Sequence, residues 1–241
     1  MTKETIYEPS KEIIKDAVIS NEKFEELYKE SINNPNQFWD QQARNYLSWD
    51  KEWDVVKESD LAKGDINWFK GAKLNASVNC VDRHLENNGE KIAIIWEGDD
   101  PQDSLKITYK QLHESVCRFA NALKKRGISK GDRVCIYMPM IPEAAYAMLA
   151  CARIGAIHSV VFGGFSPESL KDRILDSDCE SVITADEGLR GSKKIPLKNN
   201  VDTALEDCPN VHSVFFFFFT NAEVDWNDKR VVVYQEIFDS V

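Results

Sequence analysis

Five consecutive phenylalanines, Phe215 to Phe219, constrain the fold of this chain more than any other feature of its sequence. Successive side chains of a β-strand point to opposite faces, so a strand made of such a run can bury its rings only when both of its faces are covered. Left exposed, the run would promote aggregation. Residues 212–219 are therefore predicted to form a strand that is buried on both sides.

Strand-like and helix-like segments alternate ahead of this run. The apolar segments that predict strands are 92–96, 133–138, 156–161, 181–185 and 212–219. Helices are expected between them, starting at the capping-box pair Thr108 and Gln111, at Pro142, at Pro167 and near Val201. This alternation predicts an α/β fold, with a doubly wound and largely parallel sheet flanked by helices.

The first quarter of the chain differs in charge and pattern. More than half of the net charge of −10 lies within residues 1–60, and Ser20 and Asn34-Pro35 have the pattern of helix starts. Aromatic anchors are spaced along it at Phe38, Trp39, Tyr46, Trp49 and Trp53. We predict a helical amino-terminal leader at 1–70 that packs on an α/β subdomain at 71–241. An independently folded helical unit is the alternative.

Composition excludes several classes of protein. A pI near 5.0 argues against a nucleic-acid-binding face, because phosphate backbones require a concentrated positive surface. The sequence contains no apolar stretch of the length of a signal peptide or of a membrane span, so a cytoplasmic protein without a membrane partner is expected. The six cysteines are scattered and favour buried free thiols over disulfides or a zinc site.

Familiar ligand-binding loops are absent from the sequence. It contains no GxxxxGK[ST], GxGxxG or GxSxG pattern. The interpretations as a P-loop protein, a dinucleotide-binding protein or a hydrolase therefore each lack their usual loop. The four histidines do not have the spacing of metal ligands, and no metal site is predicted. A functional site must therefore be sought from the position of loops in the predicted sheet.

Ligands of doubly wound sheets bind beyond the carboxyl ends of the strands. The loop that follows Val161 contains Gly163 and Gly164, and Ser166 then has the pattern of a helix N-cap. A sharp turn alone would account for both glycines. The alternative is a neutral part of a ligand that passes the bare backbone, because Glu168 in the first helical turn would repel a phosphate.

A second loop on the same predicted edge is basic. It follows Ala185 and places Arg190, Lys193 and Lys194 within five residues, while Gly191 and Ser192 could offer backbone amides. Charged surface turns are common, so a solvated turn is one reading. The other is a phosphate-binding loop, since the arginine guanidinium suits bidentate phosphate contacts.

Five stretches of the sequence resemble the AMP-forming acetyl-CoA synthetases, which belong to the acyl-adenylate-forming enzymes. They are FWDQQARNYLSWDKEWD, INWFKGAKLNASVNCVDRHLE, ITYKQL, GDRVCIYMPMIPEAAYAMLACARIGAIHSVVFGGFSPESLKDRI and ITADEGLRGSKKIPLK. The resemblance implies a ligase that joins acetate to coenzyme A at the expense of ATP, by way of acetyl-adenylate. The alternatives from the pattern are a non-catalytic module that binds coenzyme A or adenine nucleotides, and a dinucleotide-dependent oxidoreductase.

The resemblance also assigns roles to residues. It implies that Arg190, Gly191, Ser192 and Lys193 hold the phosphorylated nucleotide end of coenzyme A, and that Phe162, Gly163 and Gly164 line the route of its pantetheine arm. Members commonly carry a second arginine where this chain has Lys193, which lacks the planar fork. The main ATP and Mg²⁺ sites and the adenylation lysine are expected after residue 241, in the remainder of the polypeptide. No catalytic residue is therefore assigned, and this chain alone is expected to be inactive.

Overall fold

The computed structural model of this chain describes residues 7–191, 193–226 and 230–234. The chain divides into two compact units, Met1–Lys73 and Leu74–Val241. Within the described residues, no helix combines the length and the apolar character that a membrane crossing requires.

The first unit begins with three helices. They are α1 (Lys11–Asp16), α2 (Asn21–Asn33) and α3 (Pro35–Tyr46). The hydroxyl of Ser20 accepts a hydrogen bond from the backbone N–H of Lys23 at 3.2 Å, which makes it the N-cap of α2. Pro35 occupies the first turn of α3, where its missing N–H costs nothing. Both predicted helix starts are confirmed.

A β-hairpin follows the helices, and the expectation of helices throughout residues 1–70 is wrong for this part. Strands β1 (Val55–Asp60) and β2 (Asp65–Lys70) pair antiparallel, with Asp60 opposite Asp65 at the turn. Gly64 provides the positive φ of 75° that this turn requires. β-branched and aromatic residues in both segments favour the strand conformation, and the short turn lets them pair locally.

Aromatic rings hold the end of this unit together. The rings of Trp49, Trp53 and Phe69 lie with their centroids 4.9 to 5.4 Å apart. Ala43 is the one fully buried hydrophobic residue in the described part of the unit. Because so few apolar side chains of this unit are buried, we still predict that the unit packs against another surface.

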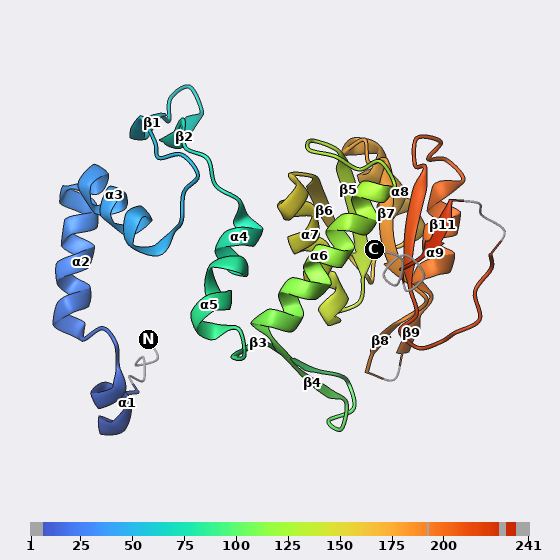
Figure 1. Cartoon of the computed structure of the whole chain (residues 1–241), viewed down its shortest axis with the longest axis horizontal. Coiled ribbons are helices and arrows are strands. Elements are labelled where there is room, and N and C mark those ends of the chain that lie inside the picture. The colour runs from blue at the N-terminus through green and yellow to red at the C-terminus, as the bar shows by residue number, and fades with distance from the viewer. Residues whose placement is uncertain (1–6, 192, 227–229, 235–241) are drawn as a thin grey trace, which may run out of the picture. The chain divides into compact units, whose positions relative to one another are not determined.

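The second unit is built on a five-stranded parallel sheet, as predicted (Figure 1). In spatial order its strands are β11 (Val231–Val233), β10 (Ser213–Phe217), β7 (Ser181–Ala185), β5 (Arg133–Met138) and β6 (Ile157–Phe162). Four of them match the predicted strands, and β11 is an addition that the sequence pattern did not indicate.

Four helices flank this sheet. They are α6 (Tyr109–Lys125), α7 (Pro142–Ile154), α8 (Pro167–Asp176) and α9 (Leu197–Leu205). The capping box of Thr108 and Gln111 is formed in both directions, at 2.9 and 3.2 Å. Gly155 ends α7 with a φ of 78°, a conformation that glycine adopts without steric cost.

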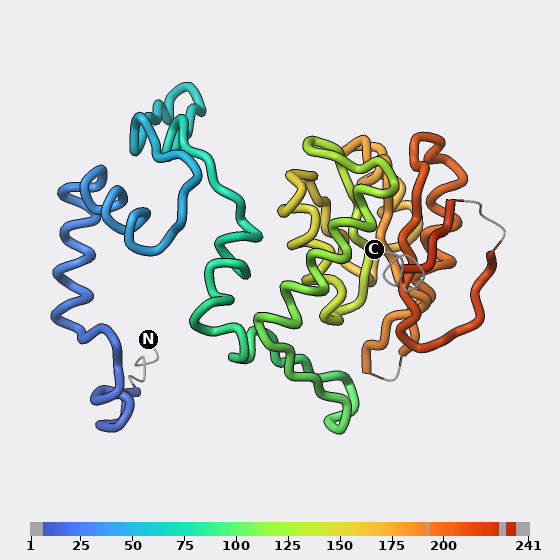
Figure 2. The backbone as a smooth tube through the Cα atoms, viewed as in Figure 1, coloured from blue at the N-terminus to red at the C-terminus, as the bar shows by residue number. Residues whose placement is uncertain are grey.

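The order of the strands places a crevice at the carboxyl end of β5. The chain runs from β5 through α7 to β6, and then returns past β5 through α8 to β7 and through α9 to β10 (Figure 2). Right-handed crossovers put α7 on one face of the sheet and α8 and α9 on the other. The loop after β5 therefore leaves toward one face of the sheet, and the loops after β6 and β7 leave toward the other. Ligands of such sheets bind in the crevice between loops that diverge in this way.

The first three residues of the phenylalanine run, Phe215 to Phe217, are buried as expected, but the strand ends at Phe217 and not at Phe219. Alternate rings point to opposite faces, so Phe215 and Phe217 contact the ring of Phe119 from α6, with centroids 6.2 and 5.5 Å away. On the other face the ring of Phe216 lies 5.1 Å from that of Trp226. Phe218 is 39 % exposed, because it follows the last paired residue of the strand.

The segment 92–96 does form a strand, but not one of the parallel sheet. Strand β3 (Ile92–Glu97) pairs antiparallel with β4 (Ser104–Thr108) in a separate two-stranded sheet. The six-residue connection between them allows antiparallel pairing, whereas a parallel neighbour requires a crossover of a dozen or more residues. The indole N–H of Trp96 donates to the backbone carbonyl of Met140 at 2.7 Å, so this hairpin contacts the loop after β5.

Short helices precede the hairpin and are tied to α7. They are α4 (Ala76–Cys80), the 3₁₀ turn η1 (Asp82–His84) and α5 (Leu85–Asn88). The guanidinium of Arg153 donates two hydrogen bonds of 2.7 Å to the carboxylate of Asp82. These bonds hold the pKa of Asp82 below its ordinary value, so the pair contributes stability that is lost only as the pH falls through that lowered pKa.

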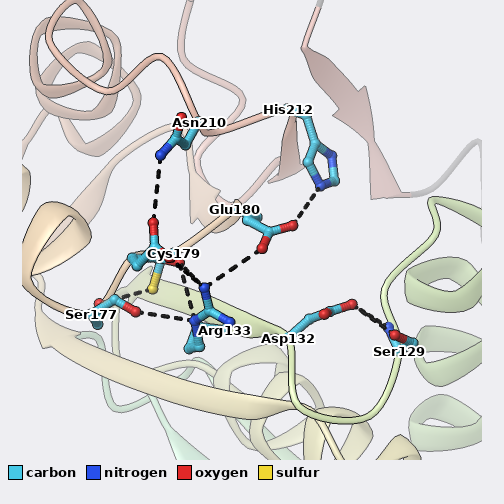
Figure 3. Close-up of polar contacts among 9 residues, drawn as sticks. Ser129, Asp132, Arg133, Ser177, Cys179, Glu180, Asn210 and His212 are labelled. Atoms are coloured by element: carbon cyan, nitrogen blue, oxygen red, sulfur yellow. Dashed lines mark hydrogen bonds and ion pairs between the residues drawn. The ribbon is translucent and has the colours of Figure 1, made fainter.

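A polar cluster closes the opposite, amino-terminal edge of the sheet (Figure 3). Arg133, at the start of β5, donates to the backbone carbonyl and to the carboxylate of Asp178, at 2.9 and 2.7 Å. Glu180, just before β7, lies 3.6 Å from Arg133 and 3.7 Å from His212. The cluster thus fastens the starts of three strands and lies away from the edge where a ligand is expected.

All six cysteines are free thiols. Cys135, Cys151, Cys179 and Cys208 are buried, Cys117 is half-buried and Cys80 is exposed. Burial raises the pKa of Cys151 to about 12. Because the unfolded chain loses this proton first, folding becomes progressively less favourable as the pH rises from about 9 toward 12.

Thiol labelling of the native chain at pH 8 should therefore be selective. We expect Cys80 to react with a disulfide reagent within seconds to minutes, because the thiolate is the nucleophile and only exposed thiols meet the reagent. The four buried thiols should react only after unfolding in guanidinium chloride. A Cys80→Ser variant is the control, and it should lose the fast phase. Rapid reaction of four or more thiols in the native chain would contradict this burial.

Candidate functional site

A largely apolar pocket of about 710 Å³ lies at the carboxyl ends of β5 and β6. One wall is the end of β5 and the start of α7, with Met138, Met140 and Met148. The loop after β6 forms a second wall, and the segment after β7 forms a third. The pocket therefore occupies the crevice that the strand order creates.

The glycine loop, residues 162–165, lines this pocket with Phe162, Gly163 and Gly164. Neither glycine has a positive φ, so backbone conformation does not explain them. A Cβ on Gly163 would lie 3.1 Å from the carbonyl oxygen of Met138, which is backbone and cannot move aside cheaply. One on Gly164 would lie 2.5 Å from the ring of Phe162. Close packing thus restricts the space at both glycines, by backbone at Gly163 and by the half-exposed ring of Phe162 at Gly164, which would have to shift for a Cβ.

The helix after the glycine loop begins as predicted. Ser166 is the N-cap of α8 and accepts a hydrogen bond from the backbone N–H of Ser169 at 3.4 Å. Its hydroxyl also donates to the carboxylate of Glu168 at 3.2 Å. A negative side chain thus occupies this helix start, in accord with a neutral ligand part next to the glycine loop.

The basic loop is a short hairpin and not an irregular turn. Strands β8 (Gly188–Arg190) and β9 (Lys193–Ile195) pair antiparallel, with Arg190 opposite Lys193. Gly191 has a φ of 59° at the tip. Ser192, which we predicted as an amide donor, lies outside the described residues.

The basic hairpin, residues 188–195, contacts the glycine loop through the side chain of Arg190. The guanidinium of Arg190 lies 5.2 Å from the ring centroid of Phe162, within the range of a cation–π contact. Arg190 also lines the pocket, whereas Gly191 and Lys193 do not. The ammonium of Lys194 pairs with the carboxylate of Glu187 at 3.1 Å. The structure thus brings Arg190, Phe162, Gly163 and Gly164 together, and leaves Lys193 exposed and outside the pocket lining.

Sequence reasoning missed two features at this edge of the sheet. The first is the apolar wall of the pocket, which comes from α7, where Ala144 and Met148 have the pattern of ordinary core residues. The second is Asp186, which is 1 % exposed and accepts hydrogen bonds from the backbone N–H groups of Phe219, Thr220 and Ala222 at 2.9 to 3.2 Å. Its position directly after a buried strand was the available signal.

In the part of the chain that the structure describes, no group of three or more His, Cys, Asp or Glu side chains gathers to hold an ion. His158, on β6, has its pKa lowered by burial, which favours the neutral imidazole. The pocket lining carries one guanidinium, Arg190, and one carboxylate, Asp99, among backbone and apolar surface. The apolar surface suits a neutral, flexible arm of a ligand, and Arg190 suits an anionic end.

The fold and this pocket are those of a ligand-binding α/β protein, and comparison with known families shows which family it is. The family model described as "AMP-binding enzyme" matches residues 81–232, and the chain belongs to that family. A second model, described as "Acetyl-coenzyme A synthetase N-terminus", matches residues 24–80.

Similar proteins with known names indicate a narrower group within this family. The chain is 60 % identical to acetyl-coenzyme A synthetase 2 of Pseudomonas aeruginosa, over 91 % of this chain and 34 % of that protein. It is 58 % identical to the acetyl-coenzyme A synthetase of Saccharophagus degradans, over 98 % of this chain and 37 % of the relative. The chain therefore spans about a third of the length of these relatives.

A solved structure supports the fold. The acetoacetyl-CoA synthetase from Streptomyces lividans is similar over 87 % of this chain and 32 % of that chain, with a TM-score of 0.76 and 21 % sequence identity. At this identity the likeness concerns the fold alone, and it agrees with the α/β class predicted from the alternation of segments.

Proposed function

We propose that this chain is the amino-terminal part of an acetate–CoA ligase and that it contributes part of the coenzyme A site. In such a ligase, acetate attacks the α-phosphate of ATP to give acetyl-adenylate and pyrophosphate, and the coenzyme A thiol then displaces AMP. The identity of 58 to 60 % with acetyl-coenzyme A synthetases supports the choice of acetate. The partner of this segment is then the remainder of the ligase polypeptide.

One observation carries the part assigned to coenzyme A: Arg190 and the glycine loop line the same pocket. Coenzyme A has a narrow, uncharged pantetheine arm and a nucleotide end with several phosphate charges. The close-packed Gly163 and Gly164 present bare backbone to the arm, and Arg190 at the rim presents a planar donor to a phosphate. Exposed Lys193 and Gly191 at the hairpin tip, together with Ser192, complete the proposed phosphate contacts.

ATP and Mg²⁺ are the remaining reactants of the proposed reaction. No residue of this chain is proposed to hold either of them or to act as a catalytic residue. The described residues contribute substrate binding, because the pocket contains no nucleophile and no pair of carboxylates that could exchange protons with a substrate.

Titration calorimetry with coenzyme A tests this assignment. We expect Arg190→Ala to weaken binding about tenfold or more, because a hydrogen bond to a charged group contributes about 1.5 to 3 kcal/mol. Lys194→Ala, in the same hairpin, is the matched control. Its affinity for coenzyme A should equal that of the wild type, because the Lys194 ammonium is already paired with Glu187. Pantetheine, which lacks phosphates, should not distinguish the two proteins. Equal affinity of the wild type and Arg190→Ala for coenzyme A would refute the assignment.

A further inference from the structure

The two halves of the proposed site meet on helix α9, which follows the basic hairpin directly. Leu197, the first residue of α9, is fully buried. Its two methyl groups lie 3.5 Å from the positions that a Cβ would take on Gly163 and on Gly188. The start of α9 thus packs against the glycine loop and the basic hairpin at once, and any movement of α9 would change the space between them.

A hydrogen-bonded link joins the same elements. Tyr137, the penultimate residue of β5, is completely buried. Its hydroxyl donates to the backbone carbonyl of Phe165 in the glycine loop at 2.7 Å. The same hydroxyl accepts a hydrogen bond from the side-chain amide of Asn200 on α9 at 3.0 Å. One oxygen atom therefore connects the central strand, the glycine loop and the helix that carries the basic hairpin.

The chemistry of the phenol suits this double role. A protonated hydroxyl has one hydrogen to donate and lone pairs to accept, so it can satisfy a carbonyl and an amide together. Burial raises the pKa of Tyr137 above its ordinary value, which keeps the hydroxyl protonated at neutral pH. A position that only had to fill the core would be served by phenylalanine, which has the same ring and needs no partner.

We propose that Tyr137 and Asn200 are positioning residues for coenzyme A: their shared hydrogen bonds fix the glycine loop at the separation from Arg190 that the ligand requires. This inference rests on the proposed function of the pocket. A ligand that spans two walls is sensitive to their separation, and supporting hydrogen bonds behind a site set such separations. Neither residue is among those that line the pocket, so they act through the loop and not by contact.

The test compares Tyr137→Phe with the wild type by two measurements. Hydrogen–deuterium exchange, read by mass spectrometry, should be about five- to tenfold faster for the amides of 163–166, since a neutral hydrogen bond contributes about a factor of 2 to 10. Calorimetry should show coenzyme A binding weakened by a similar factor. Exchange in β7 and β10 should be unchanged. A general loss of stability would instead speed exchange in these strands too.

Tyr146→Phe is the matched control. It removes the hydroxyl of a half-buried tyrosine on α7 that hydrogen-bonds Ser115, and it should leave loop exchange and coenzyme A affinity unchanged. Asn200→Leu removes one of the two bonds and should give a smaller effect in the same direction. The double variant should lose no more than Tyr137→Phe, because that variant already removes both bonds of the link.

The outcomes separate this inference from the proposed function. If the wild type binds coenzyme A, and Tyr137→Phe neither weakens binding nor speeds exchange at 163–166, the positioning role is overturned while the site stands. Losses of Tyr137→Phe and Asn200→Leu that simply add would overturn it as well. If the wild type fails to bind coenzyme A but exchange at 163–166 still rises, the proposed function fails and the link between loop and helix is supported.

Discussion

Replacing Asp186 by alanine is expected to lower the free energy of unfolding of the second unit by about 3 to 5 kcal/mol. The side chain is 1 % exposed, and its two carboxylate oxygens accept from the backbone N–H groups of Glu187, Phe219, Thr220 and Ala222. Alanine would leave these donors, which are partly buried, without a protein partner. The midpoint of urea unfolding, followed by circular dichroism, measures the loss.

Two variants frame this result. Asp186→Asn keeps one acceptor oxygen and should lose less than Asp186→Ala. Asp207→Ala removes a carboxylate that is 70 % exposed and pairs with Lys171 at the surface, and should change stability by less than about 1 kcal/mol. Because the basic hairpin follows Asp186 directly, the alanine variant should also weaken coenzyme A binding. A midpoint equal to that of Asp207→Ala would show that the buried carboxylate does not organise this edge.

Replacing Phe119 by alanine should cost a comparable amount, about 3 to 5 kcal/mol. Its ring is fully buried between α6 and the sheet, with the rings of Phe215, Phe217 and Tyr234 at centroid distances of 6.2, 5.5 and 4.8 Å. Alanine would open a cavity over the phenylalanine run, which cannot collapse because the sheet beneath it is rigid. The same urea experiment measures the change.

The phenylalanine run contains its own control. Phe218→Ala removes a ring that is 39 % exposed and contacts only one side of the strand, so its cost should be well below that of Phe119→Ala. The Phe119 variant should also bind a hydrophobic dye and aggregate on heating, because loosening this face exposes strand-forming apolar residues. Equal losses for the two variants would mean that the run is not held mainly from the α6 side.

Local signals in the sequence were sufficient for most elements of the second unit. These signals lie within a few residues of the helix ends that they define. They are the capping box at Thr108, the αL glycine at Gly155 and the proline of α8, and each acts through the hydrogen bonds or backbone angles of neighbouring residues. The β1–β2 hairpin was missed because charged residues interrupt the apolar pattern of its strands, and the pairing between them decides their conformation.

The sequence by itself determined the class of fold, the edge of the sheet where a ligand is expected and the residues of the glycine loop and basic hairpin, because alternating apolar periods and glycines express local conformational limits. Only the tertiary structure decided that Arg190 lies over Phe162 and that Tyr137 joins loop to helix. Those contacts join residues 28 to 63 positions apart, and their geometry follows from packing across the sheet, which no local pattern encodes.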